Sequence, residues 1–442
     1  MRPGSPVLAQ SRRAPASDVD LAFYRLWRGT KGVIALECAF GGALDASVLA
    51  SAVELLLDDQ PIVGSRLVPE PHDPHWLPVR GSERAVLTVV DSGLEFERMR
   101  CVGVDAAAGP QIALVLWRRA QGDRLLLKVT HVLGDGVSLQ LLAGRLASLY
   151  SSLAEDPDHR PNGGLADARD PRALLNEISR LRRLRAILDF AWFMAPRLLP
   201  RPTHRLAVPD GPAGPRVAVV RRLAAPSLSA VARYGKERGA TVNDVFLTAA
   251  YRALAAEGWD GTSALRIPIT VDVRRWCLAP DRRETIGNVS AFEYPFLIRR
   301  LGGSFDETLA RVVTLTQRRK KSGPGLAIGL ISLRMSARRL AKGAVRPEAG
   351  SDVRRRRGRV LLTFSNEGLL DKSSLRFGAE APSEACILPP FVVLPTLHVC
   401  LSGYDGALTL AAITSENGEA HVARFLDALL HELPLELGLV TA

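Results

Sequence analysis

The most informative segment of this 442-residue chain is Leu125-Leu-Leu-Lys-Val-Thr-His131-Val-Leu-Gly-Asp135-Gly136-Val-Ser138. Residues 125–130 are mostly apolar and run without a break into the histidine, which is typical of a buried strand. Beyond the Gly-Asp-Gly turn, residues 138–150 place one apolar stripe at helical spacing, formed by Leu139, Leu142, Leu146 and Leu149. The sequence therefore predicts a strand, a tight turn and a helix, with His131 at the end of the strand.

A histidine in this position has the properties that a general base needs. The end of a buried strand is a rigid mount with little water around it. The positive end of the following helix disfavours imidazolium, so we expect His131 to be neutral and able to accept a proton. The residues alone leave other interpretations open: Asp135 caps the helix, Gly136 serves only the turn, and His131 is an ordinary core histidine.

Strand and helix patterns alternate along both halves of the chain. Strands are predicted at 32–40, 61–68, 111–117 and 125–130 in the first half, and at 216–223, 265–273, 359–364, 396–402 and 407–414 in the second. Helices are predicted at 45–57, 138–150, 178–199, 227–238, 242–256, 305–317 and 418–432. This alternation predicts an α/β (α+β) protein with mixed sheets and flanking helices.

The two halves are separated by residues 196–216, which hold six prolines. Such a density is incompatible with a helix or a central strand. We therefore predict an N-terminal lobe over 1–195, a proline-rich linker over 196–216 and a C-terminal lobe over 217–442.

Composition and missing motifs exclude several classes of protein. The chain is 47% hydrophobic and has no period in its glycines or prolines, so it is neither disordered nor collagen-like. It has no zinc spacing, no P-loop, no G-x-G-x-x-G and no G-x-S-x-G, so we expect no metal and no bound cofactor. Five scattered cysteines, no apolar signal segment and no long apolar run lead us to expect a cytoplasmic protein.

The formal net charge of +12 indicates attraction to an acidic partner. No nucleic-acid-binding signature accompanies it, so we expect no nucleic acid partner. Residues 178–199 combine arginines with Phe190, Trp192 and Phe193. They fit either a helix that lies on a membrane surface or a helix that packs its aromatic side on a lobe, and we favour the second.

His131, Asp135 and Gly136 form an HxxxDG motif, which resembles the signature of the condensation-domain-like acyltransferases. That superfamily includes chloramphenicol acetyltransferase, nonribosomal peptide condensation domains and wax ester synthases. Thr130 stands where part of the superfamily has a first histidine, so the chain is closer to the single-histidine branches. The resemblance extends over nearly the whole chain, at residues 40–45, 61–66, 241–247, 286–290, 363–368 and 402–406.

The resemblance implies two chloramphenicol-acetyltransferase-like lobes with a substrate channel between them. It implies that His131 is the general base, that Asp135 pairs with an arginine, and that the Gly136 N–H helps to hold an oxyanion. Arg274 is the expected partner of Asp135, with Arg275 as its rival. It also suggests three residues of the channel, Asn288, Ser290 and Asn366, each of which is equally explained as a polar group at a strand end.

The expected activity is acyl transfer from a CoA or carrier-protein thioester to a hydroxyl acceptor. The thioester is a co-substrate, and the acceptor is a hydroxylated small molecule or a lipid. Amide formation is an alternative reaction, and a non-catalytic binding protein of the same fold is an alternative class. The partners implied are acyl-CoA or an acidic acyl carrier protein, with peripheral membrane contact as a further alternative, and the resemblance implies a monomer.

Overall fold

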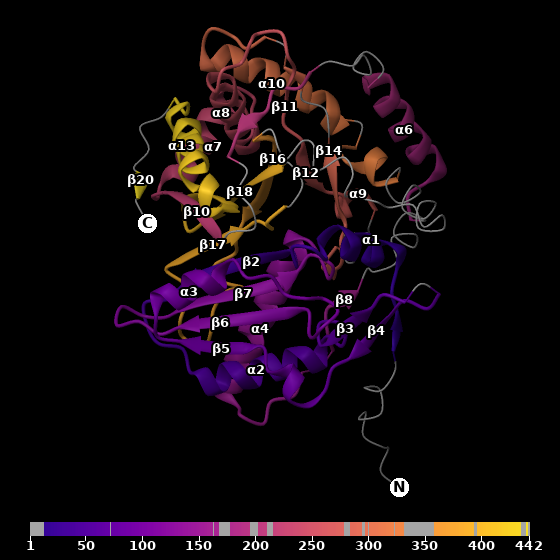
Figure 1. Cartoon of the computed structure of the whole chain (residues 1–442), viewed down its shortest axis with the longest axis vertical. Coiled ribbons are helices and arrows are strands. Elements are labelled where there is room, and N and C mark those ends of the chain that lie inside the picture. The colour runs from indigo at the N-terminus through magenta and orange to yellow at the C-terminus, as the bar shows by residue number, and fades with distance from the viewer. Residues whose placement is uncertain are drawn as a thin grey trace. The chain divides into compact units, whose positions relative to one another are not determined.

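The computed structural model describes residues 13–70, 72–161, 163–167, 177–194, 202–209, 215–277, 283–293, 297–298, 300–321, 323–330, 358–392, 396–434 and 439–440 (Figure 1). The chain divides into two compact units. Unit 1 comprises Met1–Pro171, Asp281–Asn288 and Asp371–Ala385. Unit 2 comprises Arg172–Pro280, Val289–Leu370 and Cys386–Ala442.

This division differs from the predicted lobes in its boundaries. Residues 172–195 belong to unit 2, although we predicted an N-terminal lobe over 1–195. Two segments from the second half of the chain, Asp281–Asn288 and Asp371–Ala385, also belong to unit 1. The periodicity of a sequence reports local structure and does not indicate which distant segments pack together. Most of the predicted linker over 196–216 lies outside the described residues, which include only 202–209 and 215–216 of it.

Unit 1 is built on a five-stranded sheet with the order β17-β2-β7-β6-β5. Its strands are β17 (Glu384–Leu388, which begins in unit 1), β2 (Val33–Ala39), β7 (Arg124–Thr130), β6 (Ile112–Trp117) and β5 (Leu87–Val90). β7 pairs antiparallel with both β2 and β6, and Val33 stands opposite Thr130. All seven residues of β2 are buried, as expected for a strand covered on both faces.

Helices lie on this sheet along both of its faces. α4 (Gly136–Glu155) contacts β2 and β7, and α2 (Ala46–Asp59) packs beside it (Figure 1). α3 (Gly93–Arg100) contacts β5 and β6, where Phe96 meets Trp117 at a ring distance of 5.1 Å. α1 (Asp18–Trp27) begins at a capping box in which Ser17 and Asp20 bond reciprocally. The remaining elements of unit 1 are β1 (Ala14–Pro15), β3 (Ser65–Val68), β4 (His75–Pro78), the 3₁₀ helix η2 (Gly81–Arg84), β8 (Ala166–Asp167) and β13 (Thr285–Ile286).

Unit 2 is built on a mixed sheet with the order β14-β12-β16-β18-β19-β10-β20, and β9 pairs with β16. The strands are β9 (Leu206–Ala207), β10 (Arg216–Leu223), β12 (Ile269–Asp272), β14 (Ser290–Glu293), β16 (Arg359–Leu369), β18 (Thr396–Tyr404), β19 (Ala407–Ser415) and β20 (Leu439–Val440). β16 and β18 run parallel, whereas β18 and β19 run antiparallel. A separate pair joins β11 (Leu265–Arg266) to β15 (Leu297–Ile298).

One apolar core joins this sheet to most of the helices of unit 2. The described part of unit 2 contains the helices α6 (Arg180–Met194), α7 (Ser227–Glu237), α8 (Val242–Ala256), α9 (Arg274–Cys277), α10 (Phe305–Lys321) and α13 (Glu419–His431), with the 3₁₀ helix η5 (Glu416–Gly418). Phe246 of α8, Phe364 of β16 and Phe425 of α13 are fully buried in this core. No helix within the described ranges is long and apolar enough to cross a membrane.

The structure confirms the predicted class, with both units combining a mixed sheet and helices. One predicted strand, 265–273, is instead two short strands that break at Pro268. Proline has no N–H to continue a ladder, and only its carbonyl is used, by the amide of Phe364 at 2.9 Å. The helices α1 and α3 were not predicted from the sequence.

Lys128 is a charged residue in the middle of the buried strand β7. Its side chain turns toward the C-terminal end of α3, where Nζ donates to the carbonyl oxygens of Met99 (3.0 Å) and of Val102 just beyond the helix (3.2 Å). The residue is only 3% exposed, and burial lowers the pKa of its ammonium group to about 8. At a pH between this value and the higher pKa of Lys128 in the unfolded chain, the lysine is protonated more often in the unfolded chain than in the folded chain.

This difference predicts that the free energy of unfolding increases with pH as the Lys128 ammonium group loses its proton. Between pH 7.5 and 9.5, the free energy of unfolding of the wild type should rise by about 2 kcal/mol relative to that of Lys128→Met. Other groups change the stability with pH in the opposite direction, such as the Cys400 thiol, whose pKa is raised by burial. The comparison of the two proteins cancels these contributions, because both contain the same groups. Urea unfolding of both proteins at the two pH values measures the difference. An identical pH dependence in the two proteins would contradict a pKa lowered by burial.

Candidate active site

His131 stands at the point where β7 gives way to the turn before α4. Its backbone N–H donates to the Gly32 carbonyl at 2.9 Å, which extends the β2–β7 ladder by one residue. Trp27, at the end of α1, packs against Gly32 so closely that a Cβ there would lie 2.4 Å from the indole ring. The glycine therefore lets α1 approach the end of the strand that carries the histidine.

The imidazole ring of His131 lies among aromatic side chains from α1. Trp27 is stacked on it with a centroid distance of 5.2 Å and an interplanar angle of 19°. Phe23 lies 5.3 Å away in a tilted arrangement. Nδ1 is 3.1 Å from the carbonyl oxygen of Gly134, which can only accept a hydrogen bond. This contact assigns the proton to Nδ1 and leaves the lone pair on Nε2 as an acceptor.

The surroundings also determine the protonation state of the ring. Burial is the largest influence and lowers the pKa of His131, while the negative charge of Asp135 opposes the shift. The side chain keeps partial exposure to solvent. His131 is therefore a neutral imidazole at pH 7 whose Nε2 is the basic nitrogen, which is the protonation state that a general base requires.

Asp135 is the N-cap of α4. It is 2% exposed, and its Oδ1 accepts from the backbone N–H of Ser138 at 3.2 Å and lies 3.0 Å from the Ser138 hydroxyl. The capping interpretation is thus confirmed. Arg274 belongs to unit 2, where its Nη1 lies 3.1 Å from Asp272, so its pairing with Asp135 stays a prediction. The side chain of its rival, Arg275, lies outside the described residues.

Gly136 is the first residue of α4, which runs for 20 residues. The first N–H groups of a helix have no partner within it and form the positive end of its dipole. A developing oxyanion near this end would meet backbone donors, which is the role that the resemblance gives to Gly136. That role stays a prediction.

A segment far along the chain supports the turn. Asn288 directs its Nδ2 to the carbonyl oxygens of His131 (3.0 Å) and Val132 (3.2 Å). The Ser138 hydroxyl accepts from the Gly287 amide at 3.0 Å. The predicted channel residue Asn288 thus contacts the backbone of the motif.

The other two predicted channel residues belong to unit 2. Ser290 begins β14, and Asn366 lies on β16, where its Oδ1 accepts from the Gly368 amide at 3.0 Å. Neither position tests a role in a channel, so both roles stay predictions.

Three residues that shape the site were not predicted from the sequence: Phe23, Trp27 and Gln111. The hydrogen bonds of the Thr130 hydroxyl were not predicted either. Gln111 is fully buried, and its Nε2 lies 2.8–3.1 Å from the carbonyl oxygens of Ser65, Ala106 and Gly109. Thr130 donates to Gln111 Oε1 at 2.7 Å and accepts from the Leu133 amide at 3.3 Å. The sequence signal for α1 was Ser17-x-x-Asp20, a capping box ahead of an apolar run.

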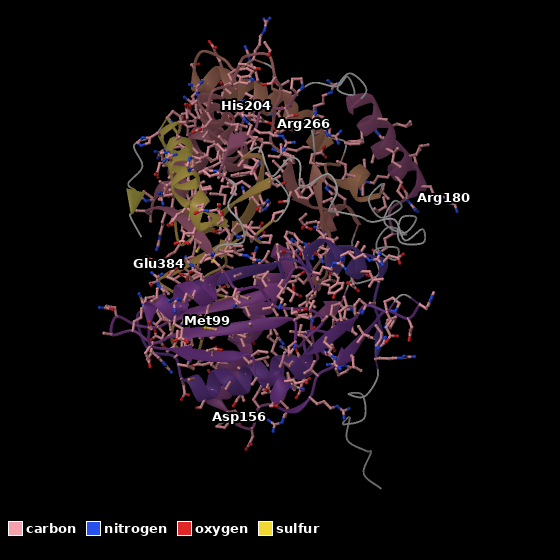
Figure 2. All side chains as sticks on the ribbon, viewed as in Figure 1. Met99, Asp156, Arg180, His204, Arg266 and Glu384 are labelled. Carbon is pink, nitrogen blue, oxygen red and sulfur yellow. The ribbon has the colours of Figure 1, made fainter. Side chains whose placement is uncertain are left out.

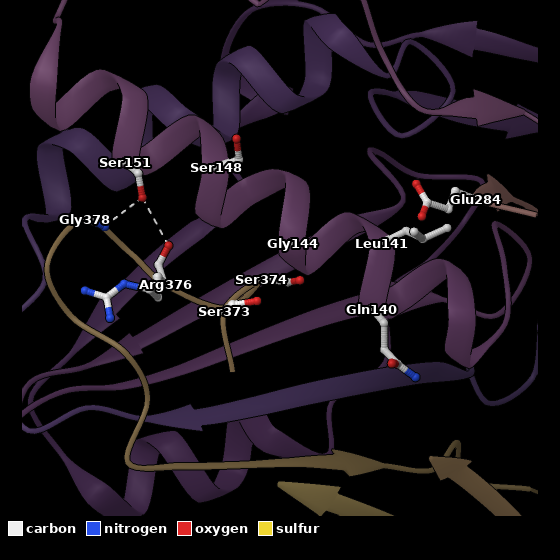
Figure 3. A pocket seen from close by; sticks show the side chains of 10 residues that line it. All are labelled: Gln140, Leu141, Gly144, Ser148, Ser151, Glu284, Ser373, Ser374, Arg376 and Gly378. Carbon is white, nitrogen blue, oxygen red and sulfur yellow. Dashed lines mark hydrogen bonds between the residues drawn. The ribbon is translucent and has the colours of Figure 1, made fainter. Parts of the chain in front are cut away.

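A polar pocket of about 550 Å³ runs along α4 within unit 1 (Figure 3). Gln140, Gly144 and Ser148 line it on the helix. Ser151 bonds the backbone of the opposite wall, at the Arg376 carbonyl (3.1 Å) and the Gly378 amide (2.8 Å). His131 is not among the lining residues, so the pocket by itself does not identify the substrate of the histidine.

Comparisons with known proteins agree with this architecture. No protein-family model and no curated protein matches the chain. Among solved structures, it is similar to the first condensation domain of the calcium-dependent antibiotic synthetase in complex with substrate analogue 2a, with 18% identity and a TM-score of 0.66, covering 97% of this chain and 100% of that one. It is also similar to the epimerization domain from the third module of tyrocidine synthetase B, with 16% identity and a TM-score of 0.65, covering 96% of each.

A third similar structure is the nonribosomal peptide synthetase FmoA3 (S1046A) in its AMPPNP-bound form, with 19% identity and a TM-score of 0.64. The match covers 97% of this chain, which spans 43% of that chain. At such identities the similarity shows the fold, which is the condensation-domain fold that we predicted from the HxxxDG motif. Membership of the superfamily, and the branch within it, stay predictions.

The contact between Thr130 and Gln111 predicts a stability effect. Thr130→Val removes the hydroxyl and leaves Gln111 Oε1 buried without its donor, which should cost about 1–3 kcal/mol in the free energy of unfolding. Thr130→Ser keeps the hydroxyl and serves as the matched control, with a smaller loss. Urea unfolding measures both. Equal losses in the two variants would mean that packing of the methyl group, and not the hydrogen bond, holds Thr130.

The environment of His131 predicts its titration. Its NMR midpoint should lie below 6.5, the ordinary value for histidine. Asp135→Asn should lower the midpoint further, because the carboxylate favours the imidazolium, while asparagine remains a good N-cap. The signal is assigned by its loss in His131→Asn. A midpoint above 6.5, or a rise in Asp135→Asn, would contradict the assigned causes.

Proposed function

We propose that this chain is an acyltransferase that uses a thioester donor and forms an ester, with His131 as the general base. The observation that carries the proposal is the neutral Nε2 of His131, left as an acceptor by the contact between Nδ1 and the Gly134 carbonyl. The condensation-domain fold supports it, because the similar antibiotic-synthetase structure is described as a condensation domain with a substrate analogue.

The reaction follows from these groups. Nε2 of His131 takes the proton of the acceptor hydroxyl while the oxygen attacks the thioester carbonyl. The oxyanion that forms would be held near the N-terminus of α4, where the Gly136 N–H is our proposed donor. The carbon–sulfur bond then breaks, and the imidazolium returns its proton to the leaving thiolate. The products are an ester and a free thiol, and the histidine is neutral again.

The donor is proposed to be acyl-CoA or an acyl group on an acidic carrier protein, because the net charge of +12 favours either anion. The acceptor is proposed to be a hydroxylated small molecule or a lipid. Amide formation with an amine acceptor is the second candidate, favoured by the similarity to a peptide-synthetase condensation domain. No bound cofactor takes part in either reaction.

A thiol-release assay tests the proposal. Acyl-CoA and carrier-bound acyl thioesters would be offered with alcohol and amine acceptors, and acceptor-dependent release of free thiol would be followed. His131→Ala should lower kcat/KM about 10²–10⁴-fold, the usual contribution of general base catalysis. The wild-type kcat/KM should rise with pH to a plateau, with an inflection below 6.5, because the base must be unprotonated.

His204→Gln is the matched control, because His204 is also buried with a pKa lowered by burial but lies in unit 2. This variant should keep its activity. Equal losses in both variants, or full activity in His131→Ala, would refute the base role. Faster release with amines than with alcohols would replace the ester reaction by amide formation, and no acceptor-dependent release from any donor would favour a binding protein.

A further inference from the structure

The outer face of α6 exposes a row of leucines. Leu181, Leu184 and Leu188 are 77%, 54% and 58% exposed, although α6 belongs to unit 2, which has a large apolar core (Figure 1). Their spacing of three and four residues places them on one stripe of the helix. Few leucines elsewhere in the described chain are as exposed, and those, such as Leu94, stand singly. Single exposed leucines are normal, whereas a row along one helix face indicates a surface that something covers.

Arginines stand on both sides of this row. At about 100° per residue, Arg180 and Arg185 lie about 70° to either side of the middle of the leucine stripe. The Arg185 side chain is 82% exposed and lies 4.0 Å from Asp189, one turn further on. Arg180, at the start of the helix, is exposed as well (Figure 2). Both long side chains can therefore extend to the level of the leucines with their charges at the edges of the apolar stripe.

The opposite face of α6 holds the helix to unit 2. Ala186 is 3% exposed. The Arg182 guanidinium lies 5.1 Å from the Trp276 ring centre. The Arg319 guanidinium of α10 lies 5.7 Å from the Phe190 ring centre. Residues 182, 186 and 190 share this face by their spacing of four. The interpretation that aromatic residues face the lobe is thus supported at Phe190, whereas the side chains of Trp192 and Phe193 lie outside the described residues.

We infer that the leucine face of α6 binds the surface of an anionic lipid membrane. The occupant follows from the charge pattern: an apolar stripe with cations along both edges matches a flat interface that is apolar inside and negatively charged at its surface. The arginines meet the lipid phosphates, while the leucines enter the boundary between headgroups and acyl chains. This surface goes beyond the proposed acyl transfer, since no residue of α6 belongs to the candidate active site.

Vesicle co-sedimentation of the full chain tests the inference. The vesicles contain phosphatidylcholine alone or with 30% phosphatidylglycerol. The wild type should bind the anionic vesicles at least about 10-fold more tightly than the neutral ones, and added salt should weaken this binding. The triple variant Leu181→Ser, Leu184→Ser, Leu188→Ser should lose at least about 10-fold in affinity. The double variant Arg180→Gln, Arg185→Gln should lose the preference for anionic vesicles.

Leu94→Ser is the matched control, because Leu94 is 64% exposed on α3 beside Glu95. It should bind vesicles like the wild type. Circular dichroism and thiol release, measured on each variant, separate loss of folding or of acyl transfer from loss of binding. Three results would overturn the inference: no binding to anionic vesicles, an equal loss in Leu94→Ser, or binding to soluble polyglutamate in place of vesicles, which would indicate an acidic protein partner.

Discussion

The hydrogen bond between His131 Nδ1 and the Gly134 carbonyl is the contact on which the candidate site depends. It requires the turn from β7 to α4 to fold back on the ring, so the backbone groups of the turn need partners from other segments of the chain. Distant parts of the chain supply the partners: Gly32 for the amide of His131, and Asn288 for two carbonyl groups. The turn is therefore held by long-range contacts, and the tautomer of one histidine depends on all of them.

Two opposing influences act on the same ring. Burial under Trp27 and Phe23 favours the neutral imidazole, whereas the Asp135 carboxylate favours the imidazolium. Burial is the larger influence, and the same carboxylate caps α4 through the amide and hydroxyl of Ser138. A capped helix and a neutral base are thus compatible, and the structural and chemical interpretations of the motif do not exclude each other.

Local patterns explain which parts of the structure were predictable. The strand, the turn and the helix around His131 follow from an apolar run, two glycines and a leucine stripe, all within a few residues of one another. Gln111 bonds Thr130 across 19 residues, and Asn288 bonds His131 across 157 residues. Trp27 lies on a helix that was not predicted. A single sequence holds no signal for such pairs, and the same reason explains why the return of 281–288 and 371–385 to unit 1 was missed.

The weak basicity of His131 bears on the choice between ester and amide. An imidazole with a pKa below its ordinary value cannot form a free alkoxide, so an alcohol must lose its proton as the new bond forms. Such a reaction depends closely on the orientation of Nε2, which the Gly134 contact fixes. A neutral amine attacks a thioester without prior loss of a proton and needs the base less. Within the acyl transfer that we propose, a histidine held in one tautomer is therefore better matched to a hydroxyl acceptor.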